Sequence, residues 1–157
     1  MVSVGQKAPD FTLKTIGQSG PTDFSLSSLK GKNVVLLFFP LVNTPVCFDE
    51  LCGVRDSMAE YQKLNAEVVA LSVDSPFAQK LWADANHYTF TMVSDFNKEV
   101  SKAYGAQHED LIGLKGVAKR SAFVIDREGV LRYVWVSDSP KVKPDFTEIQ
   151  ACLKGLN

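Results

Sequence analysis

One cysteine of this chain stands where its sulfur can become a nucleophile. Cys47 follows Thr44 and Pro45, and a continuous apolar run ends just before them. A hydroxyl residue followed by proline is typical of a helix start, with Thr44 as the N-cap and Pro45 as the first helical residue. Cys47 then lies in the first turn, where unpaired amides and the positive helix end favour a thiolate, the reactive form. Position alone also fits a small buried apolar cysteine.

Two acids next to Cys47 oppose this chemistry. Asp49 and Glu50 bring negative charge close to the sulfur in the sequence, and like charge disfavours a thiolate. We therefore expect a positive side chain from elsewhere in the fold to lie against Cys47. The Thr44 hydroxyl is expected to accept the amide hydrogen of residue 47 and to point at the sulfur or its substrate.

The elements that position Cys47 are predicted from hydrophobic patterning. Apolar, β-branched or aromatic runs predict strands at residues 34–39, which we place at the centre of the sheet, 68–73, 122–125 and 130–136. Start and stop signals predict helices at residues 45–64, 76–86, 97–104 with Gly105 as its stop, and 145–153.

The order of these elements predicts an α/β fold. The first three runs are expected to form parallel βαβ units, and the fourth follows the third through a turn-like sequence ending in Gly129, which predicts an antiparallel hairpin. Residues 11–21 suggest an added N-terminal hairpin. Together they predict a thioredoxin-like mixed central sheet with helices on both faces, in a single domain covering residues 1–157.

Composition excludes several classes of function. Lysine plus arginine (17) nearly balances aspartate plus glutamate (18), so no broad basic field exists for nucleic acid. The N-terminus resembles no secretion signal and no apolar run is long enough to span a membrane, so a cytoplasmic protein is expected. His87 and His108 are interpreted as surface or loop residues, and we expect neither a metal nor a nucleotide, flavin or haem cofactor.

Several segments resemble the peroxiredoxin family. Residues 40–47 resemble its active-site pattern Pro-x-x-x-Thr-x-x-Cys, in the place where that family has it. The likeness continues at residues 8–11, 74–77 and 119–126, and so runs along nearly the whole chain. Residues 97–105 and 116–121 look closest to the AhpE-type and bacterioferritin-comigratory-protein (Q-type) subgroups.

The resemblance implies a thiol-dependent peroxidase. Cys47 would be the peroxidatic cysteine, which attacks a hydroperoxide and becomes a sulfenic acid. Pro40 would shield the pocket and Thr44 would bond the peroxide. Arg120 would supply the positive charge that offsets Asp49 and Glu50. A homodimer, recycled by a thioredoxin-like protein or a small thiol, is the implied form.

Cys52 is implied as the resolving cysteine, because Q-type proteins use the same spacing of five residues. On an intact helix this spacing separates the two Cα atoms by roughly 8 to 9 Å, beyond the limit of about 7 Å for a disulfide. The helix start must therefore unwind before the bond forms. Cys152 is interpreted as structural.

Three alternatives remain open at this point. The first is a peroxidase without a resolver, since AhpE-type relatives often recruit an external thiol. The second is a thioredoxin-like disulfide reductase, although four residues rather than two separate Cys47 from Cys52. The third is a non-enzymatic redox sensor.

Overall fold

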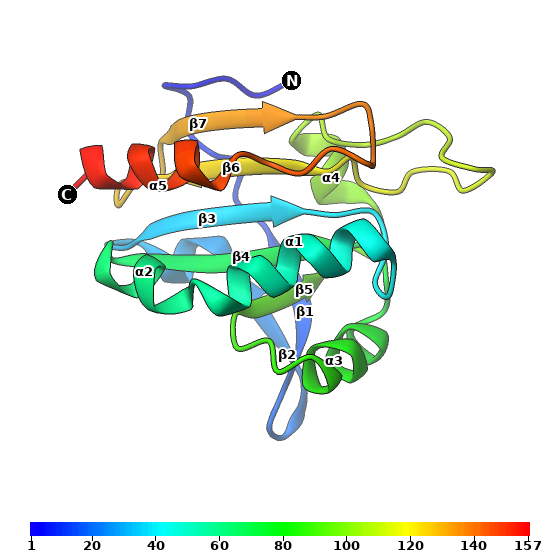
Figure 1. Ribbon diagram of the computed structural model, residues 1–157. Helices are drawn as coiled ribbons and strands as arrows, with labels where there is room; N and C mark the ends of the chain where they lie inside the picture. The colour runs from blue at the N-terminus through cyan, green and yellow to red at the C-terminus, as the bar shows by residue number, and fades with distance from the viewer.

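Seven strands form one mixed sheet in the computed structural model, which describes residues 1–157 (Figure 1). They lie in the order β2-β1-β5-β4-β3-β6-β7. Their bounds are β1 Thr12–Gly17, β2 Gly20–Ser25, β3 Asn33–Phe38, β4 Ala66–Ser72, β5 Thr91–Ser94, β6 Ser121–Ile125 and β7 Leu131–Val136. The predicted mixed sheet and the N-terminal hairpin, β1 with β2, are confirmed.

The helices begin where the sequence predicts, with two differences. They are α1 Pro45–Asp56, α2 Met58–Lys63, α3 Pro76–Ala85, α4 Glu99–Ala103 and α5 Phe146–Gly155, with a short 3₁₀ helix at Leu26–Leu29. The prediction of a single helix over residues 45–64 is wrong, because α1 and α2 are separated at Ser57, where the backbone leaves helical geometry with ψ 10°. The amide of Ser57 bonds the carbonyl of Val54, the tighter pattern of a helix end. The helix expected at residues 97–104 is shorter, as Lys98 is left-handed with φ 63°.

Strand direction follows the prediction for two of the three apolar runs. β3 is parallel to β4, and β4 to β5, but β6 is antiparallel to β3, so the parallel prediction for residues 122–125 is wrong. The segment between β5 and β6 stays at the carboxyl end of β3, because β6 begins at Ser121 opposite Phe38, the last residue of β3, and the chain then runs back along it. The hairpin of β6 with β7 is confirmed. β4, rather than the predicted β3, is the middle strand, because the four-residue β5, which was not predicted, lies between β1 and β4.

An apolar core lies on each face of the sheet. One contains side chains of α1, α2, α3 and α5, and the other contains side chains of α4, the 3₁₀ helix and the N-terminal segment. Every residue of β3 is buried, as expected for a strand covered on both faces. In Figure 1, α1 lies along the sheet after the chain leaves the carboxyl end of β3. None of the helices is long and apolar enough to cross a membrane.

Candidate active site

Cys47 lies in the first turn of α1. Thr44 occupies the N-cap position with extended backbone angles, φ −113° and ψ 149°, and Pro45 is the first helical residue, both as predicted. The amide of Phe48 donates the first helical hydrogen bond to the carbonyl of Thr44 at 2.9 Å. The Cys47 side chain is turned into the core and is fully buried.

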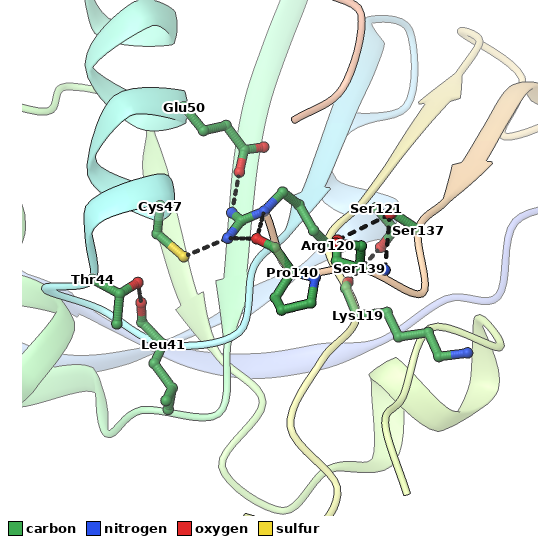
Figure 2. A network of polar contacts seen from close by, with 10 residues as sticks. All are labelled: Leu41, Thr44, Cys47, Glu50, Lys119, Arg120, Ser121, Ser137, Ser139 and Pro140. Atoms are coloured by element: carbon green, nitrogen blue, oxygen red, sulfur yellow. Dashed lines mark hydrogen bonds and ion pairs between the residues drawn. The ribbon is translucent and has the colours of Figure 1, made fainter. Parts of the chain in front are cut away.

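The expected positive side chain is present against Cys47. Arg120 directly precedes β6, and its Nη2 donates to Cys47 Sγ at 3.1 Å (Figure 2). Arg120 is itself buried, with 1% of its surface exposed, so water does not screen this contact. A guanidinium held in this way stabilises negative charge on the sulfur.

Two acceptors orient the Arg120 guanidinium. Its Nη1 donates to Glu50 Oε1 at 2.7 Å, and its Nε and Nη2 donate to the carbonyl of Pro140 at 3.1 and 2.9 Å. Glu50 was expected to oppose a thiolate at Cys47. The structure differs, because the Glu50 carboxylate is paired with Arg120 and its charge is offset there. Asp49 is exposed on the same helix. The carbonyl of Pro140 was missed, since a backbone acceptor leaves no signal in the sequence.

The Glu50–Arg120 pair is electrostatically poised. Burial raises the pKa of Glu50 to about 7, although the Arg120 charge and hydrogen bond pull it down. Burial opposes the charge on Arg120, but Glu50 and Cys47 outweigh it and hold the pKa of Arg120 above its ordinary value. Glu50 Oε2 is buried and has no hydrogen-bond partner. Near neutral pH the pair therefore adds or loses a proton at Glu50, and Arg120 stays charged.

The Thr44 hydroxyl does not cap α1, contrary to the prediction. Its Oγ1 donates to the carbonyl of Leu41 at 2.9 Å, because the turn before the helix brings that carbonyl within reach. The hydroxyl hydrogen is thus engaged, and the oxygen lone pairs remain as acceptors.

The loop before α1 is tied to the neighbouring strand. Pro40 is buried at the end of β3, and the amide of Val42 donates to Asp74 Oδ2 at 2.9 Å. Asp74 follows β4, and its carbonyl accepts from Ser94 Oγ at the end of β5. No role was expected for Asp74, although an acid at the carboxyl end of an adjacent parallel strand was the available signal.

Cys52 stays on the same helix as Cys47. α1 is unbroken between them, so the separation that excludes a direct disulfide applies, and all three cysteines are free thiols. Cys52 is half-buried, and its Sγ lies 3.3 Å from Tyr88 Oη. No role was expected for Tyr88 from the sequence.

The remaining residues lie apart from this network. Cys152 is partly buried on α5, where burial raises the pKa of its thiol. His87 is exposed and His108 lies in a loop, both within the prediction, but the His108 side chain is buried where its backbone pairs with Val117 and Gly116. No group of three or more histidine, cysteine or acidic side chains is arranged to hold a metal ion.

The sequence is similar to those of known proteins. The profile of the AhpC/TSA family matches residues 4–134, most of the chain. The chain belongs to this family of peroxiredoxins. Membership makes it a thiol-dependent peroxidase, and the resemblance stated from the sequence is confirmed. It also decides against a thioredoxin-like disulfide reductase and a non-enzymatic sensor.

Individual peroxiredoxins match over nearly their whole length. Alkyl hydroperoxide reductase E of Mycobacterium tuberculosis is 38% identical over 146 residues, which cover 91% of each chain. A putative peroxiredoxin bcp of Coxiella burnetii is 40% identical over 151 residues, 92% of each chain. The crystal structure of Enterococcus faecalis AhpC superposes with a TM-score of 0.86 at 27% identity, covering 99% of this chain and 92% of the other. The thioredoxin-like peroxiredoxin fold is therefore confirmed.

Proposed function

We propose that this peroxiredoxin reduces hydrogen peroxide and organic hydroperoxides through Cys47, and that Cys52 then closes an intramolecular disulfide. The observation that carries the proposal is the hydrogen bond from Arg120 Nη2 to Cys47 Sγ, 3.1 Å long, at a helix start. A buried sulfur that receives both a guanidinium and the positive end of a helix is suited to react as a thiolate.

The first step forms a sulfur–oxygen bond and breaks the peroxide bond. The Cys47 thiolate attacks the terminal oxygen of the hydroperoxide, and the bonding electrons leave with the other oxygen, which takes a proton and departs as water or alcohol. Arg120 stabilises the charge that moves from sulfur to oxygen. Thr44 accepts the peroxide hydrogen, since its own hydrogen is held by Leu41. Pro40, buried at the end of β3, keeps bulk water from the sulfur.

The second step requires α1 to open. Cys52 attacks the Cys47 sulfenic acid and releases water, and this needs the first turn of α1 to unwind because both residues lie on one intact helix. A thioredoxin-like protein or a small thiol then reduces the disulfide. The three cysteines are too few and too unevenly placed for a disulfide scaffold of the kind that secreted domains use, and we place the protein in the cytoplasm.

A homodimer is part of the proposal. On α3, Phe77 and Leu81 are 66% and 75% exposed, and their spacing of four residues puts them on one face of the helix. A second copy of the chain is the expected cover for these apolar side chains. Light scattering of the wild type and of Leu81→Glu tests this, and a monomeric wild type would contradict it.

Rapid-mixing kinetics test the chemistry. Wild type, Cys47→Ser and Cys52→Ser are mixed with hydrogen peroxide or an organic hydroperoxide, with Cys152→Ser as the matched cysteine control. We expect Cys47→Ser to lose rapid oxidation, and Cys52→Ser and Cys152→Ser to keep it. Rapid oxidation that survives in Cys47→Ser would overturn the assignment of Cys47.

Mass spectrometry of the oxidised protein tests the second step. The wild type should hold a Cys47–Cys52 disulfide, whereas Cys52→Ser should stop at the sulfenic acid and pass on to the sulfinic acid with excess peroxide. A wild type that shows only these acids at Cys47 would make the protein a peroxidase without a resolver.

A further inference from the structure

Tyr88 makes a contact that the chemistry at Cys47 does not use. Its Oη lies 3.3 Å from Cys52 Sγ, within hydrogen-bond distance for sulfur. Tyr88 belongs to the segment between α3 and β5, so an element remote in sequence meets the sulfur of the proposed resolving cysteine.

The Tyr88 ring is held in place by other aromatic rings. It stacks on Phe90 with the ring centroids 5.2 Å apart, and it packs edge-on against Trp82 at 5.3 Å. Only 8% of the Tyr88 surface is exposed. The hydroxyl therefore has a fixed position, and losing it alone would leave the ring packing in place.

The charges around the contact favour the phenol as donor. Burial raises the pKa of Tyr88, and its contact with Cys52 raises it further, so the phenol keeps its hydrogen. Arg55, one turn along α1 from Cys52, is the positive group of this region. It is held by Asp56 at 3.0 Å and by the carbonyl of Asn86 at 2.8 Å. Cys47 is the other titratable group that acts on Tyr88.

We propose that Tyr88 is a positioning residue for the resolving step, which donates a hydrogen bond to Cys52 and holds its sulfur ready as the nucleophile. This inference rests on the proposed role of Cys52. The part of α1 that carries Cys52 stays folded against Tyr88, and the first turn that carries Cys47 is the part that unwinds. The oxidised sulfur is thereby brought to a nucleophile that is already in place.

The step balances without another reagent. The Cys52 thiolate attacks the sulfur of the Cys47 sulfenic acid, the S–S bond forms and the S–O bond breaks. The hydroxide that leaves takes a proton and becomes water. The Cys52 sulfur is oxidised and the Cys47 sulfur is reduced by the same electron pair. Tyr88 keeps its proton and contributes only its hydrogen bond.

Alkylation of Cys52 tests the hydrogen bond directly. In a Cys47→Ser, Cys152→Ser background, Cys52 is the only thiol, and its rate with iodoacetamide is measured from neutral to strongly alkaline pH. Tyr88→Phe should lower the rate at neutral pH by about tenfold, the expected effect of one hydrogen bond to a charged group. At alkaline pH, where every thiol is ionised, the deficit should disappear or reverse, because a thiolate without the hydrogen bond is the more nucleophilic. Loosened packing would instead raise the rate at every pH.

The same substitution in the otherwise wild-type chain tests the resolving step. Tyr88→Phe should leave the oxidation of Cys47 unchanged, slow the appearance of the disulfide by about tenfold and increase the sulfinic acid at Cys47. Tyr133→Phe is the matched control, because it removes a hydroxyl that bonds Glu148 at 2.8 Å and not a cysteine.

The outcomes separate the two proposals. If Tyr88→Phe matches the parent in both alkylation and disulfide formation, Tyr88 has no positioning role, although Cys52 still resolves. If the wild type never forms the disulfide, the resolving role of Cys52 is wrong and the role of Tyr88 is wrong with it. A Tyr133→Phe protein that slows resolution as much as Tyr88→Phe would also overturn the inference.

Discussion

Replacing Arg120 by glutamine should slow the oxidation of Cys47 by about 10²- to 10³-fold. Arg120 supplies one fixed donor to Cys47 Sγ at 3.1 Å, in a place that water does not reach. Removing one preorganised donor from a site where charge develops raises the activation free energy by about 2.7–4 kcal/mol, which corresponds to the 10²- to 10³-fold slowing. Arg120→Lys should recover only part of the rate, because an ammonium cannot bond the sulfur, Glu50 and the Pro140 carbonyl in one plane.

The stability of Arg120→Gln should depend on pH in a defined direction. In the wild type the pKa of Glu50 is about 7, against 4.5 in the unfolded chain. Without Arg120 the folded pKa rises further, so the folded state keeps a proton that the unfolded state has lost. The free energy of unfolding then falls as the pH rises from 4.5 to the new folded pKa. In the wild type this fall ends near pH 7, whereas in Arg120→Gln it continues to higher pH. Adding Glu50→Gln should remove this loss without restoring the rate.

Stopped-flow tryptophan fluorescence provides the assay, because Trp82 and Trp135 both pack in or against the core cluster that contains Cys47. Lys119→Gln is the matched control, since Lys119 pairs with the exposed Asp138 rather than with the sulfur. Oxidation of Arg120→Gln within about threefold of the wild-type rate would refute the electrostatic argument. Equal slowing by Lys119→Gln would refute it as well.

Three further predictions follow from single contacts. The raised pKa of Glu50 should make the wild-type free energy of unfolding fall by up to about 3 kcal/mol between pH 4.5 and about 7. When this free energy is measured by urea unfolding at several pH values, it should depend less on pH in Glu50→Gln. Asp74→Ala should slow Cys47 oxidation severalfold and speed hydrogen exchange at the Val42 amide, because that amide loses its carboxylate acceptor. Asp145→Ala should lower stability by about 1 kcal/mol in thermal unfolding with unchanged peroxidase rate, because Asp145 accepts from the amides of Thr147 and Glu148 at the start of α5 and bonds neither Cys47 nor Arg120.

Local signals predicted well where Cys47 lies in the fold. The position of Cys47 depends on the Thr44-Pro45 helix start and the apolar strand before it, both of which act within a few residues. For the partner of Cys47, the residues around it predicted only that a positive side chain would be present. That the charge belongs to Arg120, 73 residues further along the chain, came from the family resemblance, because spacing alone does not reveal which strands become neighbours.

Contacts made by the backbone or across the sheet were not predictable in this way. The Pro140 carbonyl acts through an atom that every residue has, and Tyr88 meets Cys52 only after α3 and β5 are placed. His108 illustrates the same limit, because its burial depends on pairing with Val117 rather than on its own polarity. The Thr44 hydroxyl was misassigned because it donates to the Leu41 carbonyl, in the turn before the helix, and accepts from no amide of α1.

The uncapped start of α1 connects the two steps of the proposed chemistry. Ser75 caps α3 by accepting from the Ala78 amide at 3.1 Å, and Asp145 caps α5, whereas no side chain accepts from the first turn of α1. Such a cap is worth about 1 kcal/mol, so α1 begins with less local stabilisation than these two helices. Free amides in this turn favour the Cys47 thiolate, and the same missing cap lowers the cost of unwinding the turn toward Cys52. Capping α1 would therefore act against both the oxidation of Cys47 and its resolution.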